Sequence, residues 1–239
     1  MSKLIFFDTE TTGNTEKDFL VQIAYKSGNE SFCGLYKPET KIPPEASAVH
    51  HITNKMVADK PTFKESTDQP IIKKLFEDKN SIVVAHNASF DLMIIKREDI
   101  EPKNFICTLR VIRHLDTEGK MDRYNLQYLR YLLEIEVDAT AHDAMGDVLV
   151  LEKLFEYLKN RMMTEEGLDE EETIKKMLEI SSHPSLLRSF GFGKHLGKKI
   201  EDVAKVDRGY LEWLLAQKQA SDQLDEDWIY TLKHHLQVN

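Results

Sequence analysis

The sequence predicts an α/β fold, in which a mixed sheet is flanked by helices and is followed by a small, mainly helical unit. Two short runs rich in β-branched and aromatic residues, at 4–7 and 82–86, have the composition of fully buried strands. Later segments, such as the one that ends at Leu158, carry apolar residues at helical spacing. Strands that alternate with helices in this way favour a sheet with helices packed on it.

The first part of the chain predicts three strands, at 4–7, 19–25 and 31–36. Gly28 and Asn29, between the second and third strands, are typical of a tight hairpin turn. Because these strands follow one another so closely, we expect the sheet to begin with antiparallel pairs.

Helical segments follow this predicted hairpin. A short helix is expected over 45–51, and Thr53 can cap a further helical turn. The segment 66–78 is amphipathic and predicts a longer helix. One face of that helix is predicted to carry Ile71, Ile72, Leu75 and Phe76.

The strand at 82–86 is followed by Asn87, a good N-cap residue, and by a predicted helix over 88–96. This arrangement places Asp91 about one turn inside the helix, close to the carboxyl end of the strand. A short strand is expected at 104–108. Three more helices are predicted, over 109–115, over 125–133, and from a capping box at 140–143 through Leu158.

Residues 165–172 include six acids and no basic residue, so we interpret them as a solvent-exposed linker. An amphipathic helix is predicted directly after it, over 172–180. The scattered arginines of the preceding segment favour contact with solvent over contact with a ligand: Arg110, Arg113, Arg123 and Arg130.

Size and composition indicate one core of ordinary size plus a small second unit in the 239 residues. No apolar run approaches the ~20 residues that span a bilayer, and the apolar run near the N-terminus leads directly into acids. We therefore expect a cytoplasmic protein without a membrane partner. Cys33 and Cys107 are too few for a disulfide framework, and because both lie in strand-like segments they are interpreted as reduced core thiols.

The charge distribution supports a division into three parts: 1–163 as the main domain, 164–184 as an acidic linker and helix, and 185–239 as a small C-terminal domain. The net charge of −9 lies entirely in residues 1–184, because the C-terminal unit has eight basic and eight acidic residues. This net charge argues against broad, non-specific attraction to nucleic acid. It remains compatible with a nucleic-acid enzyme whose acids surround metal ions.

Asp8 and Glu10 are the first candidates for a chemical site. They lie two residues apart at the end of a buried strand, so their carboxylates project from the same face. Such a pair repels itself and loses solvation, and a cation between the two groups relieves both effects. In the small-residue turn that includes Thr9, Thr12 and Gly13, backbone N–H groups can approach a phosphate or sugar. The alternative is an acid-rich surface turn.

Asp91 and Asp147 extend this pair to four carboxylates at the ends of separate elements. Oxygen ligands of this kind suit hard divalent cations, here two Mg²⁺ or Mn²⁺ ions. In a two-ion site one cation activates water and the other stabilises the departing oxygen of a phosphodiester. His142 is the candidate general base, because a histidine pKa lies near working pH.

Three motifs then point to a family. The segments D-T-E-T-T-G at 8–13, H-N-A-S-F-D at 86–91 and H-D-A-M-G-D at 142–147 resemble the three motifs of the DEDDh 3′→5′ exonucleases. Order, spacing and residue types match over about residues 1–160. The resemblance is to the proofreading-subunit-like and exonuclease X-like members.

This resemblance implies a ribonuclease H-like fold, metal ligation by the four carboxylates and a general-base role for His142. The segment S-A-V-H-H-I-T at 47–53 is similar to one that these enzymes use near the terminal nucleotide, which makes His51 a candidate contact. Asn87 and Phe90 are further candidate substrate contacts, and core packing is the alternative for Phe90.

A second resemblance covers the segments F-G-K-H-L-G-K-K-I-E-D-V and D-R-G-Y-L-E-W-L-L. These are similar to the small C-terminal domain that follows some exonuclease X-like nuclease domains, and they imply no chemistry. Phosphate contact is one hypothesis for the basic side chains of Lys194, Lys198 and Lys199. The other is a solvated loop, docked against the acids at 165–172.

Structural interpretations are preferred for several other residues. His86 is expected to bond to backbone at the end of its strand, and Asp143 to cap a helix. Trp213 is expected in a core stripe, and His50 on the surface.

The predicted function is a metal-dependent 3′→5′ exonuclease that releases nucleoside 5′-monophosphates from DNA 3′ ends, in DNA repair or proofreading. The expected partner is a nucleic acid 3′ end, with DNA preferred over RNA, and a DNA polymerase is a second candidate partner. One alternative is a 3′→5′ exoribonuclease. The other is a non-catalytic nucleic-acid-binding or polymerase-docking module.

Overall fold

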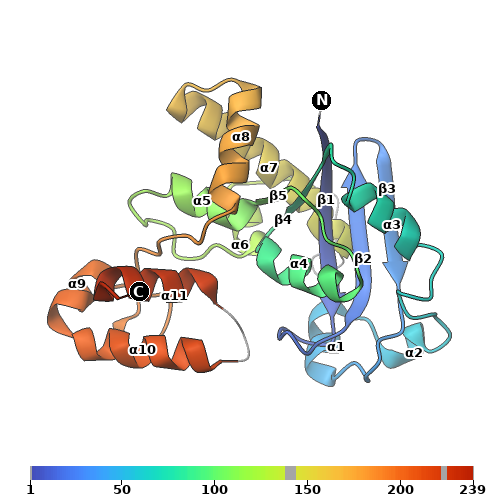
Figure 1. Ribbon diagram of the computed structural model, residues 1–239, viewed down its shortest axis with the longest axis horizontal. Helices are drawn as coiled ribbons and strands as arrows, with labels where there is room; N and C mark the ends of the chain where they lie inside the picture. Colours follow the sequence, from blue (N-terminus) through green and yellow to red (C-terminus); the bar gives the residue numbers. More distant parts are fainter. Residues whose placement is uncertain (1, 138–143, 222–224, 239) are drawn as a thin grey trace.

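A five-stranded mixed sheet of order β3-β2-β1-β4-β5 lies at the centre of the protein (Figure 1). The computed structural model describes residues 2–137, 144–221 and 225–238. The strands are β1 (Lys3–Thr11), β2 (Leu20–Ser27), β3 (Glu30–Leu35), β4 (Ser81–Ala85) and β5 (Phe105–Cys107). β1 pairs antiparallel with β2 and parallel with β4. The predicted antiparallel beginning and mixed sheet are confirmed. Cys107 is buried as predicted, but Cys33 is exposed on the edge strand β3, so its predicted place in the core is wrong.

β1 is the central strand, and its alternating side chains enter the two cores on opposite faces of the sheet. Ile5 and Phe7 pack on one face, where the Phe7 ring meets Phe76 edge to face at 5.1 Å. Phe6 points to the other face and meets Phe155 at 5.3 Å. Burying an aromatic side chain of this kind contributes roughly 1.5–3 kcal/mol, so both helical layers stabilise the position of β1.

Helices cover both faces of the sheet (Figure 1). The face of Phe7 is covered by α3 (Gln69–Phe76) and α4 (Ala88–Arg97), and the face of Phe6 by α5 (Thr108–Leu115), α6 (Leu126–Leu132), α7 (Ala144–Glu166) and α8 (Glu170–Ser181). The short helices α1 (Pro44–His50) and α2 (Asn54–Val57) follow β3. No helix in the described part of the chain is long and apolar enough to cross a membrane.

The helix predicted over 66–78 is shorter than expected and buries a narrower face. α3 begins at Gln69, with Pro70 in its first turn, where a missing N–H costs nothing. Ile72 and Phe76 are buried, but Ile71 is 61% exposed, so its predicted place on the apolar face is wrong. Adjacent helical residues point about 100° apart, and only one side of α3 meets the sheet.

The acidic run at 165–172 is not a linker. α7 continues to Glu166, and α8 begins at Glu170 after a capping box between Asp169 and Glu172. Acids at a helix N-terminus interact favourably with the helix dipole, and Glu170 also pairs with Lys159 of α7 at 2.9 Å. These contacts make the run part of two packed helices.

The C-terminal region is mainly helical, as predicted, in its described residues 185–221 and 225–238. These form the 3₁₀ turn η1 (Gly193–His195) and the helices α9 (Ile200–Val206), α10 (Arg208–Ala220) and α11 (Glu226–Leu236). These elements enclose a separate apolar cluster that includes Phe190, Leu214 and Trp228. Trp213 was expected in this core but is 54% exposed. Leu211 and Leu214 point inward, which turns Trp213 toward solvent.

Asp227 of α11 joins the C-terminal region to the sheet layers. Its carboxylate accepts from the backbone amide of Ser185 at 2.8 Å and from the guanidinium of Arg113, and it lies 3.6 Å from Arg110 Nε. Arg110 also donates to Ser181 O and to Glu226, each at 2.7 Å. The prediction that Arg110 contacts solvent is wrong, because it is only 8% exposed.

We expect Asp227→Ala to destabilise the protein by about 3–5 kcal/mol, because it removes the carboxylate that faces both the buried Arg110 and the partly buried Arg113 and leaves Arg113 without its aspartate. The measurement is chemical denaturation of the full chain. Glu226→Ala is the matched control, since the Glu226 side chain is 46% exposed and its pair with Arg110 should contribute at most about 1 kcal/mol. Equal, small losses in both variants would contradict this role for Asp227.

Candidate active site

β1 carries Asp8 and Glu10 on the face covered by α7, as the alternation of the strand predicts. In the register with β2, Asp8 is opposite Ala24 and Glu10 is opposite Gln22. The pairing shifts between Glu10 and Thr11. Such a bulge re-aims the end of a strand, so regular pairing ends at the second carboxylate.

Asp147, in the first turn of α7, brings a third carboxylate to the same point. One oxygen each of Asp8, Glu10 and Asp147 lies within 4.8 Å of the other two. Asp147 is only 9% exposed, and Gln127 of α6 donates its side-chain amide to the Asp147 carboxylate. Three oxygen donors at this spacing fit a hard divalent cation.

Gln127 was not predicted as part of the site. Only its position two residues after an N-cap asparagine marks it in the sequence, and this gives no sign that α6 packs beside α7.

Asp91 of α4 lies beside these three carboxylates and accepts hydrogen bonds from β1. Its Oδ1 accepts from the amide of Thr9 at 3.1 Å and from the hydroxyl of Thr9 at 2.7 Å. Within the described residues the structure brings together three of the four predicted ligands, and Asp91 is not one of those three. Burial raises the pKa of Asp91 to about 7, although both hydrogen bonds from Thr9 favour the charged form.

His142 lies outside the described residues, as do Asp143 and the predicted capping box at 140–143. The next described residue is Ala144, whose backbone amide donates to Gln22 Oε1 at 3.3 Å. Gln22 is the cross-strand neighbour of Glu10, so α7 starts directly beside the carboxylates.

The turn after β1 is organised by Asp18. Its carboxylate accepts from the Thr12 hydroxyl at 2.9 Å and from the amide and hydroxyl of Thr15. A Cβ on Gly13 would lie 2.6 Å from the Asp18 oxygens, so only glycine fits there. Burial alone would raise the pKa of Asp18, but these hydrogen bonds hold it below its ordinary value. The side chains of both predicted threonine contacts, Thr9 and Thr12, are therefore bonded within the protein.

His50 and His51 have opposite environments. His51 is exposed and adopts a left-handed conformation (φ 61°) at the end of α1. His50 was expected on the surface, but it is buried, and its Nδ1 accepts from the amide of Ile52 at 3.0 Å. Burial lowers the pKa of His50. His50 lies with Ala46 on the buried side of α1, and Ala46 packs with Val21 and Ile42.

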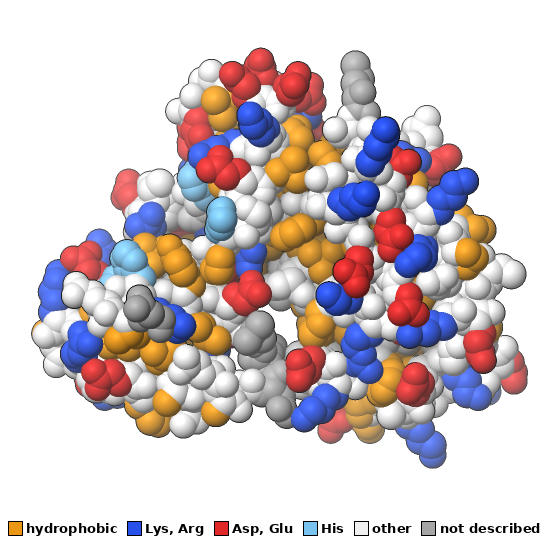
Figure 2. Space-filling model, in the orientation of Figure 1, with side chains coloured by type: hydrophobic (Ala, Val, Ile, Leu, Met, Phe, Trp, Pro, Cys, Tyr) orange, Lys and Arg blue, Asp and Glu red, His pale blue; other side chains and the backbone are white. Residues whose placement is uncertain are grey.

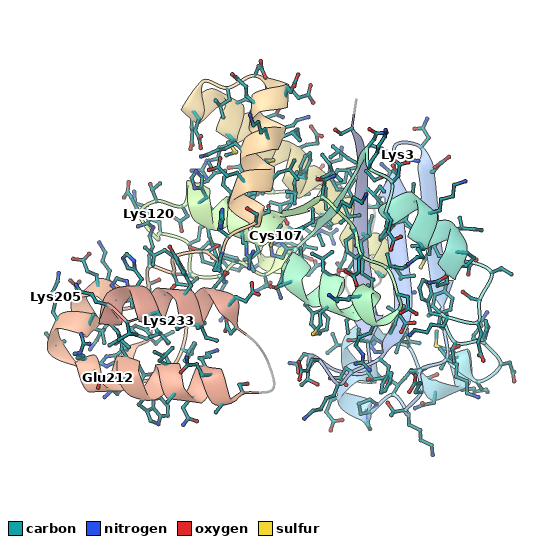
Figure 3. The ribbon with its side chains drawn as sticks, viewed as in Figure 1. Lys3, Cys107, Lys120, Lys205, Glu212 and Lys233 are labelled. Atoms are coloured by element: carbon teal, nitrogen blue, oxygen red, sulfur yellow. The ribbon has the colours of Figure 1, made fainter. Side chains whose placement is uncertain are left out.

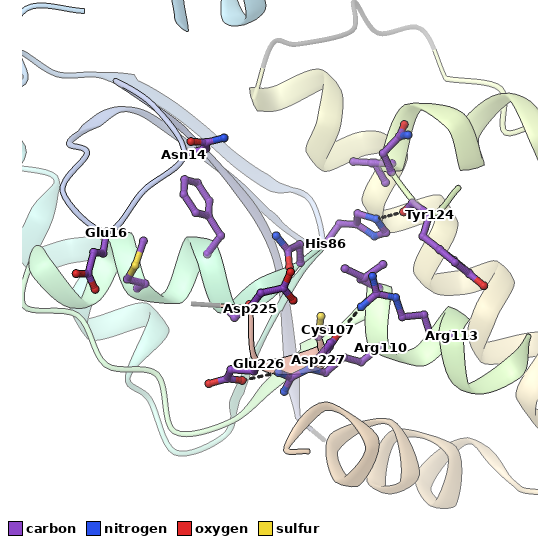
Figure 4. Close-up of a pocket in the computed structure, with 17 residues that line it drawn as sticks. Asn14, Glu16, His86, Cys107, Arg110, Arg113, Tyr124, Asp225, Glu226 and Asp227 are labelled. Carbon is purple, nitrogen blue, oxygen red and sulfur yellow. Dashed lines mark hydrogen bonds and ion pairs between the residues drawn. The ribbon is translucent and has the colours of Figure 1, made fainter. Parts of the chain in front are cut away.

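A cleft of about 680 Å³ runs along α4 and is closed on its far side by Asp225, Glu226 and Asp227 of the C-terminal region (Figure 4). Asn87 and Phe90, both predicted substrate contacts, line it. The same hollow lies between the two parts of the molecule in Figure 2.

Asn87 stands at the N-cap position of α4 as predicted, but its side chain makes no capping bond, because the residue is left-handed (φ 66°). His86, also in the cleft wall, bonds to backbone as expected. Its Nε2 donates to the Tyr124 carbonyl at 2.6 Å, and its Nδ1 pairs with the Thr108 hydroxyl at 2.9 Å. Burial lowers the pKa of His86 to about 4, so this imidazole is neutral near pH 7.

Lys194, Lys198 and Lys199 are exposed and do not line this cleft. Lys194 pairs with Asp207 at 2.7 Å. The hypothesis that these lysines dock against the acids at 165–172 finds no support among the described residues. There Glu165 pairs with Arg161 and Glu170 with Lys159.

The raised pKa of Asp91 predicts a pH dependence of stability in metal-free protein. The pKa of Asp91 in the folded protein (about 7) exceeds the ordinary 3.8. The protonated carboxyl therefore makes its full contribution to the free energy of unfolding below pH 4, and this contribution is lost as pH rises to 7. The loss is on the order of 4 kcal/mol, at about 1.4 kcal/mol per pKa unit. Asp91→Asn cannot titrate and should not show this loss.

The measurement is denaturation in chelator at several pH values, wild type against Asp91→Asn. His86 has a lowered pKa and the opposite pH dependence, which is common to both proteins and cancels in the difference. Parallel stability curves for the two proteins would show that folding does not raise the pKa of Asp91.

Two family models match separate parts of the chain. The family model described as Exonuclease matches residues 5–155, and the one described as Exodeoxyribonuclease X-like C-terminal matches residues 190–219. Exodeoxyribonuclease 10 of Escherichia coli (strain K12) is 32% identical over 204 residues, covering 85% of this chain and 83% of that protein.

Two further similarities agree with this match. DNA polymerase III subunit epsilon of Buchnera aphidicola subsp. Schizaphis graminum (strain Sg) is 32% identical over 176 residues, covering 64% of this chain and 72% of that protein. A solved structure of exonuclease X in complex with 5′ overhanging duplex DNA aligns with a TM-score of 0.59 and 28% identity, covering 74% of this chain and 99% of that one. The chain therefore belongs to the exonuclease family, has its ribonuclease H-like fold, and carries an exodeoxyribonuclease X-like C-terminal domain.

Proposed function

We propose that this protein is a metal-dependent 3′→5′ exonuclease that releases nucleoside 5′-monophosphates from DNA 3′ ends. The observation that carries the proposal is the convergence of Asp8, Glu10 and Asp147 at the end of the central strand. The preference for DNA is supported by the similarity to Exodeoxyribonuclease 10 along most of both chains. Repair or proofreading of DNA is the corresponding role.

Asp8, Glu10 and Asp147, with Asp91 beside them, would hold two divalent cations, Mg²⁺ or Mn²⁺. When bound, such cations activate an attacking water and stabilise the leaving oxygen of a phosphodiester. The donor set supports this assignment, because β1 and α7 bring three carboxylate oxygens together.

The protein's own groups prepare this site. The two hydrogen bonds from Thr9 orient the Asp91 carboxylate and favour its charged form, which is the form that can bind a cation. Gln127 orients Asp147 in the same way. We assign His142 the role of general base, which takes a proton from the attacking water.

The cleft along α4 is the proposed path of the nucleic acid strand. Phe90 lies one residue before Asp91 and lines this cleft, where its ring can contact a base. Asn87 offers a polar group at the same wall, and we assign His51 a contact with the terminal nucleotide. Gly13 keeps the turn after β1 tight against Asp18, which supports a role for its backbone near the substrate.

The proposed division of the chain is a nuclease domain at 1–163, a connecting helical segment at 164–184 and a small C-terminal domain at 185–239. The exposed lysines of the last part, Lys194, Lys198 and Lys199, are proposed to contact phosphates of the substrate. Similarity to polymerase epsilon subunits supports a DNA polymerase as a second proposed partner.

The deciding experiment uses DNA and RNA oligonucleotides of one sequence, labelled at the 5′ end, with Mg²⁺ or Mn²⁺. We expect a ladder that shortens from the 3′ end of DNA, with nucleoside 5′-monophosphates as product. Faster digestion of RNA would favour the exoribonuclease alternative. Binding without any cleavage would favour a non-catalytic module.

Two variants connect this activity to the site. Asp8→Ala should abolish turnover, because it removes a ligand, and chelation should do the same to wild type. His142→Ala should keep metal and DNA binding but lose roughly 10²–10⁴ in kcat, the usual contribution of a general base. Near-normal activity of Asp8→Ala, or activity that survives chelation, would contradict the metal mechanism.

A further inference from the structure

The C-terminal region exposes aromatic rings that its own core does not use. Trp213 on α10 is 54% exposed, and Phe192, in the loop before η1, is 39% exposed. Apolar side chains gather on this part of the molecule in Figure 2, over α10 and between α10 and α11. The nuclease site accounts for neither ring, because neither lines the cleft along α4.

A series of packed rings connects Phe192 with Trp213. Trp213 lies against Tyr210, with ring centroids 5.5 Å apart. Gly193, next to Phe192, approaches Tyr210 so closely that a Cβ would lie 2.7 Å from the Tyr210 hydroxyl. The loop that carries Phe192 is therefore packed on the same helix as Trp213. The ring of Phe192 is fixed from below by Trp228, at 5.1 Å.

Two lysines complete this surface. The Lys194 ammonium lies 4.8 Å from the Tyr210 ring centroid, and that of Lys218 lies 5.4 Å from the Phe192 ring centroid. We call the set Phe192, Lys194, Tyr210, Trp213 and Lys218 the aromatic surface. Each lysine also pairs with an aspartate at 2.7 Å, Lys194 with Asp207 and Lys218 with Asp225. Partly exposed pairs of this kind contribute little, so a phosphate can compete for either ammonium.

We propose that the aromatic surface binds single-stranded DNA, with bases stacked on Trp213 and Phe192 and phosphates near Lys194 and Lys218. Alternating rings and cations are what a sequence-tolerant single-strand site needs, because every base has a π-face and every linkage a charge. The proposal deepens the proposed function and rests on it in one respect: the strand held here is the one whose 3′ end is digested.

The charge of the two parts of the chain supports this occupant. Residues 1–184 carry the whole net charge of −9, whereas the C-terminal region is neutral overall. A polyanion therefore meets less repulsion at the C-terminal region than at most of the nuclease surface. The segment from Arg188 to Lys199 adds four basic residues without an acid.

The test is fluorescence anisotropy of labelled oligo(dT) with the full-length protein in chelator, so that nothing is cleaved. With an oligonucleotide of about 20 nucleotides, Trp213→Ala should raise Kd roughly 5- to 100-fold, which corresponds to one lost stacking contact. Phe192→Ala should act in the same direction, and the loss should grow with oligonucleotide length.

Trp213→Phe keeps a ring for stacking and should stay within a few-fold of wild-type affinity. The intrinsic fluorescence of Trp213 should be quenched by DNA in wild type, and this quench should be lost in Trp213→Phe, where the buried Trp228 alone remains. Tyr230→Ala is the matched control, because Tyr230 is 44% exposed in the same region but lies outside the aromatic surface. It should bind as wild type does.

Unchanged affinity of folded Trp213→Ala and Phe192→Ala, together with unquenched Trp213 fluorescence, would overturn the proposal and assign the aromatic surface to a protein partner. This outcome is separate from failure of the proposed function. A wild-type protein that binds oligo(dT) through Trp213 but releases no nucleotide with Mg²⁺ would contradict the nuclease assignment alone.

Discussion

The mutual repulsion of three carboxylates at the end of a buried strand is the constraint on which the rest of this structure depends. Asp8, Glu10 and Asp147 each lose solvation, and their oxygens lie within 4.8 Å of one another. Charges held this closely in a partly buried site disfavour the folded protein unless other groups compensate. The fold must therefore hold β1 and α7 together firmly enough to oppose this repulsion.

The packing around β1 provides that resistance. Phe6 and Phe7 anchor the strand to opposite layers, one through Phe155 of α7 and the other through Phe76 of α3. Because Phe155 and Asp147 lie on one helix, the contact that stabilises the sheet also fixes the third carboxylate. On the other face, Thr9 and Asp91 join β1 to α4. The helices that pack on β1, α4 and α7, are therefore also the helices that carry Asp91 and Asp147.

The C-terminal region is coupled to this site through α5. Arg110 and Arg113 reach into the cleft wall, where Asp227 and Glu226 of α11 bind them (Figure 4). The helices of this region lie to one side of the sheet (Figure 3). On the path proposed above, a DNA strand that leaves the cleft along α4 would pass the C-terminal region. α11 both lines the cleft and holds this region in place through Asp227.

Local patterns in the sequence predicted the strands, most helices and the shared face of Asp8 and Glu10, because strand alternation and helical spacing need only neighbouring residues. Contacts between distant segments were not predictable in this way. Arg110 and Trp213 illustrate the limit: whether each is buried depends on a partner helix that the sequence does not place. The acids at 165–172 formed helix ends because Lys159 and the helix dipole offset their charge. Gln127 became part of the site only through packing of α6 on α7.

Thermal unfolding of wild type and Asp147→Asn, with and without Mn²⁺, tests the central claim most directly. If carboxylate repulsion dominates the site, the metal-free variant should melt higher than metal-free wild type. Mn²⁺ should raise the wild-type Tm, by the equivalent of about 2.7 kcal/mol at 100 times its Kd, and should raise the variant's Tm far less. A variant that melts lower without metal, yet gains as much from Mn²⁺ as wild type does, would contradict the account.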